Sequence, residues 1–248
     1  MNMRLIGLGT GVVVLATTLG ACSAAQQDPQ CVVAKAVSDG STGSFAATYT
    51  LKDGQDASLA CAQLKPEPVG LEKYFSKDPG GPETVVIRSS RLGKLLDNSD
   101  VEVDPDAPNA PNAQGMLTTE APGADNFCDV PTLSPSRLVA RSVSGGPTLD
   151  LTYAWSNLRI YNTPDIPGTQ FVADLRYTEN GCTAEYKVRG IWPVVGCATK
   201  GKPDASKCEP YADPPVRLRG SGINPSFPVK CDPDALICVL TGEVPSVP

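Results

Sequence analysis

Apolar and polar residues alternate in short runs along most of this 248-residue chain, and turn-forming residues separate the runs. The 24 prolines and 23 glycines interrupt any longer helical period. Short alternating runs between turn signals are typical of an antiparallel β-sandwich or barrel. The runs expected as strands are 44–51, 71–75, 84–89, 149–161, 171–178, 182–192, 216–220 and 236–241. Segments 91–96 and 57–64 are candidates for short helical turns.

The dipeptide Asn180-Gly181 predicts a β-hairpin with a defined register, because both turn residues tolerate positive φ. A two-residue loop there places Glu179 opposite Cys182. The pairs that follow are Thr178–Thr183, Tyr177–Ala184, Arg176–Glu185, Leu175–Tyr186, Asp174–Lys187 and Ala173–Val188. Opposite charges then share one face and apolar residues the other, and a slip of one residue would destroy both patterns. Cys182 falls on the apolar face, where a buried disulfide is expected.

An acidic, Pro/Asn-rich stretch at residues 99–125 lacks apolar periodicity and is expected to be a mobile surface loop or linker. It would separate an N-terminal β-rich part (31–98) from a C-terminal antiparallel β part (126–248). Two domains, or one sandwich with an insertion, both fit this pattern. The fold class expected is therefore all-β, an antiparallel sandwich or partly closed barrel with disulfides and long Pro-rich loops.

The N-terminus has the pattern of a secretory signal. Arg4 precedes an apolar run at 5–19, which at about 15 residues is shorter than the roughly 20 needed to span a bilayer. The chain then reads Leu19-Gly20-Ala21-Cys22. This resembles the lipobox of bacterial lipoproteins, in which an apolar residue and two small residues precede a cysteine. The alternative is an ordinary signal peptide that ends near a cysteine.

The resemblance implies that residues 1–21 are removed, that Cys22 is linked to diacylglycerol, and that the new amino group is acylated. Two or three acyl chains give stable anchoring, since each buried CH₂ contributes about 0.8 kcal/mol. Residues 22–30 would form a short lipidated tether. Ser23 follows the cysteine, and the sorting pattern of Gram-negative lipoproteins then implies the outer membrane, on its periplasmic or its surface side.

Eight cysteines remain after Cys22, and an even number in an exported chain indicates four disulfides. Eight cysteines allow 105 pairings. The pairing expected from closeness in sequence is Cys31–Cys61, Cys182–Cys197 and Cys231–Cys238, which leaves Cys128–Cys208. Metal binding is the competing interpretation. The chain has no histidine and no Cys-x-x-Cys pair, so zinc is disfavoured and no metal is expected.

Charge and composition limit the classes of partner that the sequence favours. The net charge is -6 and no basic patch exists, which argues against nucleic acid and against a polybasic contact with anionic lipid. The expected partners are the membrane, through lipid on Cys22, and other envelope proteins. No cofactor is expected, because the chain lacks a glycine-rich phosphate loop of the Walker or dinucleotide type.

The lack of histidine also removes Ser-His-Asp and Cys-His catalysis. Ser90 and Lys94 are one residue too far apart for a Ser-x-x-Lys motif, and Gly220-Ser221-Gly222 does not match a nucleophile elbow. Paired carboxylates could still support glycoside hydrolysis. The candidate carboxylates are Asp150, Asp174, Glu179 and Glu185. The sequence therefore predicts no catalytic residue and favours a protein that is not an enzyme.

Oxygen ligands for calcium could come from Asp104, Asp106 and Asn109, but their spacing departs from a calcium loop and favours a solvated acidic loop. Aromatic residues gather at 149–192, where one core face of a sheet is the favoured interpretation. The alternative is a ligand pocket or sugar-stacking platform, with Tyr153, Trp155 and Trp192 as possible ligand-facing residues.

These observations favour a non-catalytic, membrane-anchored envelope lipoprotein in binding, assembly or surface structure. The whole pattern is similar to Cys-rich envelope lipoproteins of gliding soil bacteria, a resemblance that implies no particular activity. Two alternatives remain open. A small-ligand or lipid carrier predicts an aromatic-lined cavity of roughly 300–1,000 Å³, and a carboxylate-based hydrolase predicts two unpaired acids in a cleft.

Overall fold

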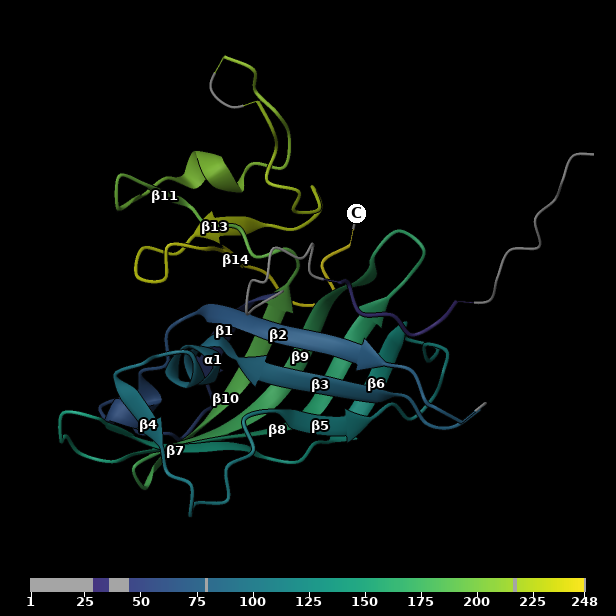
Figure 1. Ribbon diagram of the computed structural model, residues 1–248. Helices are drawn as coiled ribbons and strands as arrows, with labels where there is room; N and C mark the ends of the chain where they lie inside the picture. Colours follow the sequence, from purple (N-terminus) through teal and green to yellow (C-terminus); the bar gives the residue numbers. More distant parts are fainter. Residues whose placement is uncertain (1–28, 36–44, 79, 216–217, 248) are drawn as a thin grey trace, which may run out of the picture.

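The computed structural model describes residues 29–35, 45–78, 80–215 and 218–247 (Figure 1). A 10-stranded antiparallel sheet dominates it. Its strands are β1 (Phe45–Leu51), β2 (Glu67–Tyr74), β3 (Thr84–Ser89), β4 (Val101–Val103), β5 (Ala113–Met116), β6 (Phe127–Thr132), β7 (Ser136–Ser142), β8 (Leu149–Asn162), β9 (Pro167–Glu179) and β10 (Cys182–Ile191). The order is β4-β7-β8-β9-β10-β1-β2-β3-β5, with β6 paired to β8. The all-β prediction is confirmed.

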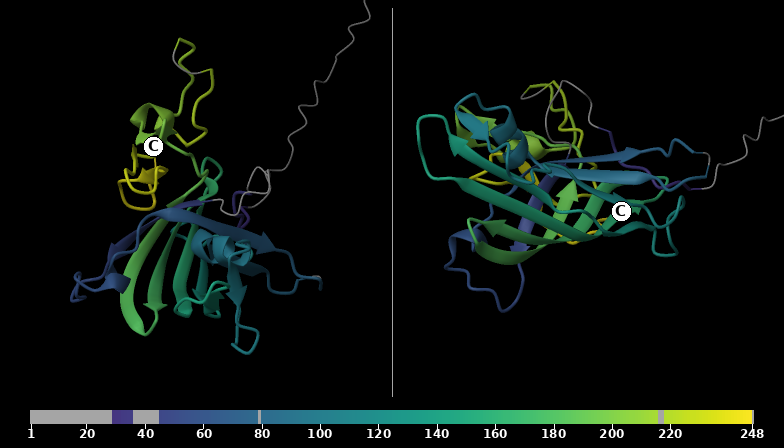
Figure 2. Two further views of the ribbon diagram at one scale, coloured as in Figure 1. Left: turned by 60° about the vertical axis from the view of Figure 1, so that its left-hand side comes forward. Right: turned by 60° about the horizontal axis from the view of Figure 1, so that its bottom comes forward.

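The sheet curls into a half-barrel, so that its edge strand β5 approaches β6 (Figure 2). Two backbone hydrogen bonds join these segments: Ser134 N donates to Gln114 O at 2.8 Å, and Thr118 N donates to Asp129 O at 3.0 Å. They hold the two edges together although β5 and β6 form no regular ladder. The expected partly closed barrel is thus confirmed.

Gly115 lies at this closure. A Cβ atom on it would lie 2.4 Å from Thr132 O and 2.6 Å from Val130 Cγ1. We expect Gly115→Ala to lower the free energy of unfolding by about 1–3 kcal/mol, because the edges would have to separate to admit the methyl group. Urea titration would measure this. Gly196→Ala is the control, since nothing lies within 4 Å of its Cβ position; equal losses in both variants would contradict the closure.

The register predicted for the β9–β10 hairpin is confirmed for all seven pairs, from Glu179–Cys182 to Ala173–Val188. The turn residues Asn180 and Gly181 both have positive φ. On the charged face, Asp174 and Glu185 form their ion pairs with Lys52 and not with the residues opposite them in the hairpin. Asp174 binds Lys52 at 2.9 Å, and Glu185 lies 4.0 Å from the same ammonium. Lys52 reaches both because it follows β1, which pairs with β10.

Segment 99–125 is not the mobile loop or linker that its composition predicted. It contributes β4 and β5 to the sheet, and Asn109 Oδ1 accepts a hydrogen bond from Val139 N at 2.7 Å. Short edge strands receive their partners from outside the segment, so local composition does not predict them. Of the two arrangements left open for this segment, a division into two domains does not match the sheet, because β1 of the N-terminal part pairs with β10 of the C-terminal part.

The two expected helical turns are α1 (Ser90–Leu96) and the 3₁₀ turn η1 (Ala60–Ala62). Beyond β10 the chain forms a smaller unit, drawn yellow-green above the sheet in Figure 1. Its elements are β11 (Ala198–Thr199), β12 (Lys202–Pro203), η2 (Ala205–Cys208), β13 (Val229–Cys231) and β14 (Cys238–Leu240). The strand expected at 216–220 is not found at 218–220, and residues 216–217 lie outside the described part.

All eight cysteines after Cys22 are in disulfides, but in none of the expected pairs. The bonds are Cys31–Cys128, Cys61–Cys182, Cys197–Cys231 and Cys208–Cys238. Sequence proximity failed because the sheet brings together segments that are 97 and 121 residues apart in the first two bonds. Cys182 does lie on the core face of its hairpin, as its register predicted, and bonds there to the buried Cys61.

Candidate functional site

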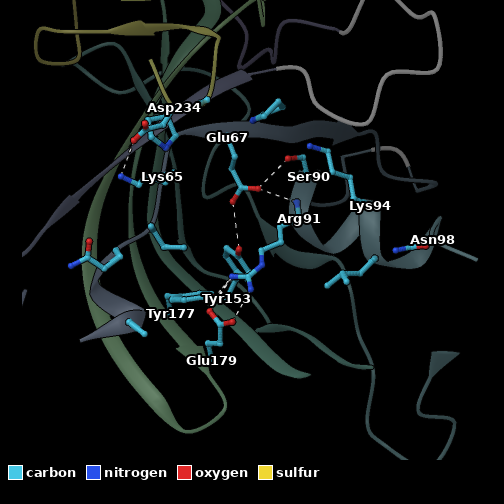
Figure 3. Close-up of a pocket in the computed structure, with 17 residues that line it drawn as sticks. Lys65, Glu67, Ser90, Arg91, Lys94, Asn98, Tyr153, Tyr177, Glu179 and Asp234 are labelled. Atoms are coloured by element: carbon cyan, nitrogen blue, oxygen red, sulfur yellow. Dashed lines mark hydrogen bonds and ion pairs between the residues drawn. The ribbon is translucent and has the colours of Figure 1, made fainter. Parts of the chain in front are cut away.

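A cleft of about 620 Å³ opens between α1, the start of β2 and the floor formed by β8 and β9 (Figure 3). The smaller C-terminal unit borders it with Asp234, which binds Lys65 at 2.8 Å. The polar residues that define its chemistry are Glu67, Ser90, Arg91, Tyr153, Tyr177 and Glu179. They come from four elements far apart in sequence.

Glu67, the first residue of β2, connects this strand to the N-terminus of α1. Its Oε2 accepts hydrogen bonds from Ser89 Oγ at 2.8 Å, Ser90 Oγ at 3.1 Å and the backbone N of Arg91 at 3.0 Å. Ser89 is also the N-cap of α1, since its Oγ accepts from Arg91 N. Because both serines are buried, the carboxylate supplies acceptors that water does not.

The second oxygen of Glu67 faces two tyrosines. Oε1 accepts from Tyr49 OH at 2.8 Å and from Tyr153 OH at 3.5 Å. Burial, and then the negative charge of Glu67, raise the pKa of Tyr49 and of Tyr153 well above the ordinary value of 10.0. Both hydroxyls therefore remain protonated donors over the physiological pH range.

A second group is built around Arg91. Its Nη2 lies 2.7 Å from Glu179 Oε1 and its Nη1 lies 3.1 Å from Glu179 Oε2, a bidentate pair. Nη1 also donates to Tyr177 OH, and that hydroxyl donates to Glu179 Oε2. The hydrogen bonds from Arg91 hold the pKa of Glu179 below its usual range, while burial and Glu179 raise that of Tyr177.

The lowered pKa of Glu179 gives a pH-dependent prediction. A carboxyl whose pKa is lower in the folded state stabilises the protein at pH values above its unfolded-state pKa. This stabilisation is lost as the pH falls through the folded-state pKa. We expect the stability difference between wild type and Glu179→Gln to be largest near neutral pH and to shrink below its ordinary value of 4.5. Denaturant titrations from pH 7 to 3 measure it.

An Arg91→Leu background provides the control for this measurement. If the stabilising effect of Glu179 comes from its ion pair with Arg91, the effect of Glu179→Gln on the free energy of unfolding should depend little on pH once Arg91 is replaced. The reason is that the coupling energy belongs to the pair. An unchanged pH-dependent difference would contradict this assignment.

The polar groups of the cleft are thus bonded to one another. Glu179 is ion-paired and Glu67 accepts from five donors, so neither resembles the unpaired acid of a hydrolase. Ser90 is 2% exposed and donates to Glu67. Lys94 is exposed and has no acidic partner among the described residues. The arrangement supports binding or a structural role better than proton transfer.

Of the aromatic residues predicted to face a ligand, Tyr153 reaches the cleft with its hydroxyl. Trp155 is 2% exposed and stacks on Tyr153 with ring centroids 6.1 Å apart. Trp192 packs against the core. Tyr153 and Tyr177 are themselves buried, so they offer no exposed ring face for stacking. The favoured interpretation, one core face of a sheet, describes these side chains.

The sequence did not single out Glu67, Arg91 or Tyr177, whereas Glu179 was among the candidate carboxylates. Ser89 before α1 carries a local N-cap signal that could have located the helix start. The partner of that cap, Glu67, lies 22 residues earlier. No spacing rule links the two.

The residues considered as calcium ligands form hydrogen bonds within their own loop. Asp104 Oδ1 accepts from Asp106 N at 3.0 Å, and Asn109 Nδ2 donates to Asp104 O at 2.6 Å. Within the described part, the one group of three possible metal ligands is Cys197, Cys208 and Cys238. All three are already in disulfides.

No helix in the part of the chain that the structure describes is long and apolar enough to cross a membrane. The predicted signal segment and lipidation site, residues 1–21 and Cys22, lie outside the described residues. The structure begins at Pro29, two residues before the first disulfide cysteine.

Comparison with known proteins found one lipoprotein relative and one matching family model. A protein from Myxococcus xanthus named "Putative lipoprotein MlpA" is 28% identical over 257 residues, covering 99% of this chain and 97% of that protein. No solved structure matches the chain. The MlpA family model matches residues 43–193, a range that contains all ten strands of the large sheet. These findings support a lipoprotein, and because the match covers more than half of the chain, the chain belongs to the MlpA family.

Proposed function

We propose that this protein is an outer-membrane lipoprotein, anchored through lipid on Cys22, with a non-catalytic role in binding, assembly or surface structure. The observation that carries the proposal is the sequence Leu19-Gly20-Ala21-Cys22, placed just before a fold that is fixed at Cys31. The name of the Myxococcus xanthus relative supports it. Eight residues lie between the two cysteines, so at most about 30 Å of chain, or nine steps, lies between lipid and fold.

This anchoring would give the barrel a defined orientation. Cys31 bonds to Cys128, which lies opposite Ile160 near the end of β8. Tyr153, on the floor of the cleft, is seven residues earlier on the same strand, about 23 Å away at 3.3 Å per residue. In Figure 1, α1, which lies beside the cleft, and residues 29–35 lie toward opposite ends of the sheet. The cleft would thus face away from the membrane, where a partner can reach it.

The test is intact mass and fractionation of the native protein. We expect a chain that starts at Cys22, carries added acyl mass and is recovered with the outer membrane. This chain should take up eight alkyl groups only after reduction. Cys22→Ser should abolish acylation, and Ser23→Asp should retain the lipoprotein at the inner membrane. A wild-type protein without acyl mass would refute the anchor, and wild type and Ser23→Asp in the same membrane would refute the sorting.

A small-ligand carrier is the second candidate, favoured by one observation. The cleft volume of about 620 Å³ lies in the 300–1,000 Å³ range of ligand sites. Native mass spectrometry of the protein in detergent would test it. A bound mass that is lost on denaturation, and absent from a variant with the cleft filled by Ala235→Phe, would support the carrier. A single ligand-free species would refute it.

A further inference from the structure

Three large apolar side chains lie where β2 and β5 end and β3 begins. Tyr74 is 55% exposed, Phe75 72% and Met116 60%. Tyr74 lies opposite Thr84, and Thr84 lies opposite Met116, so Tyr74 and Met116 project from the same face of the sheet. Phe75 follows directly at the base of the β2–β3 hairpin. We call Tyr74, Phe75 and Met116 the apolar corner.

Phe75 is held in its exposed position. The ammonium of Lys73 lies 4.6 Å from the centre of its ring, and that ammonium is fixed by an ion pair with Glu83 at 2.7 Å. The side chains of Lys73 and Glu83 are only 10% and 13% exposed. The exposed ring thus rests on a buried ion pair, and a rigid aromatic group loses little conformational freedom when it contacts a partner.

The apolar corner is connected to the N-terminal segment by a short path. Leu117 N donates to Glu83 O at 3.0 Å, and Cys31 N donates to Glu120 O at 2.8 Å. Residues 117 and 120 are three apart, so the base of the hairpin lies within roughly 20 Å of Cys31. In Figure 1, residues 29–35 and the β2–β3 hairpin lie at the same, right-hand end of the sheet. The apolar corner therefore lies beside the tether.

We propose that the apolar corner is a membrane-contact surface, whose occupant is the lipid surface that holds the acyl chains of Cys22. This inference rests on the proposed lipid anchor. At most about 25 Å of chain joins Cys22 to Pro29, so the corner stays close to lipid headgroups. Tyr and Phe are suited to that interface, since their rings enter the acyl boundary while the tyrosine hydroxyl stays in the polar layer.

A small patch is sufficient for this contact because the anchor is already in place. Tethering converts the second binding event into an intramolecular one at a high effective concentration. The corner would then fix the tilt of the barrel and keep the cleft directed away from the bilayer. A free-standing patch of this size would bind lipid only weakly.

Lipid contact can be tested with tryptophan at the corner and brominated acyl chains as quenchers. The full lipoprotein, as wild type and as Phe75→Trp, is reconstituted into phosphatidylcholine vesicles with or without bromine on the acyl chains. We expect the emission added by Phe75→Trp to be blue-shifted and quenched by roughly twofold or more, as for groups 5–10 Å deep in the interface. Wild type corrects for Trp155 and Trp192.

Val143→Trp is the matched control. Val143 is 59% exposed and bonds to Asp100 beside β4, on the side of α1. Its emission should not be quenched. Met116→Trp is the second reporter and should be quenched like Phe75→Trp, which guards against a local folding defect in one variant. Vesicle flotation of the same samples reports the anchor separately.

The outcomes separate the two proposals. Protein that floats with the vesicles while both corner tryptophans stay unquenched would overturn the membrane contact and leave the anchor standing. Protein that carries no acyl mass and does not float would overturn the anchor, and the contact with it. Corner tryptophans that are quenched only as much as Val143→Trp would also overturn the contact, and would leave the corner as a surface for another envelope protein.

Discussion

Replacing Cys61 and Cys182 together by alanine is expected to lower the free energy of unfolding by about 5 kcal/mol. The bond joins η1 to the start of β10 across 121 residues, and the chain-entropy relation for a loop of this length gives about that value. The bond also closes the core, since Cys61 is fully buried. Urea unfolding followed by tryptophan fluorescence would measure the loss.

The matched comparison is the double replacement of Cys208 and Cys238. Their bond spans 30 residues, for which the same relation gives about 3.6 kcal/mol. The effect should also be confined to the smaller unit, while loss of Cys61–Cys182 should loosen the barrel and expose Trp155. Equal losses, or a peptide map of the non-reduced protein that links Cys61 to Cys31, would contradict the assigned pairing.

The sequence predicted best those elements whose signals are local. The Asn180-Gly181 turn, together with alternating charged and apolar residues on both sides, determined the complete β9–β10 register. Strand 84–89 was predicted with its observed bounds, because turn-forming residues precede it and α1 follows it. In these cases the information lies within about ten residues of the element.

Prediction failed where structure depends on distant partners. Val101–Val103 is a strand only because β7 lies beside it, so the Pro-rich segment around it looked like a linker. The disulfides failed for the same reason, since the curled sheet places Cys61 beside Cys182. Even Cys231 and Cys238, which lie opposite each other in β13 and β14, bond to other cysteines.

The candidate site was the least predictable part. Glu67 meets Ser89 and Arg91 from 22 and 24 residues away and Tyr153 from 86 residues away. Flanking prolines give Glu67 no periodic signal. A carboxylate that accepts hydrogen bonds from the N-terminus of one helix and from two tyrosines can be recognised only after the sheet has closed.

Glu67→Gln is expected to have the largest effect of any single replacement in the cleft. The variant keeps one amide oxygen, but its NH₂ group faces donors that need an acceptor. Hydrogen bonds to a charged group contribute about 1.5–3 kcal/mol each. Because Ser89 and Ser90 are buried and have no access to water, we expect a loss of about 3 kcal/mol or more in urea unfolding.

A matched control lies on the same strand. The side chain of Glu72 has no hydrogen-bond or ion-pair partner among the described residues and is half-buried on the opposite face of β2. Glu72→Gln should therefore change stability by less than about 0.5 kcal/mol. A second measurement separates lost charge from misfolding. Since Glu67 helps raise the pKa of Tyr49 and Tyr153, spectroscopic titration of Glu67→Gln should show tyrosinate at lower pH than in wild type. If stability and tyrosine titration in Glu67→Gln both matched Glu72→Gln, Glu67 would not be the residue that connects β2, α1 and the floor of the cleft.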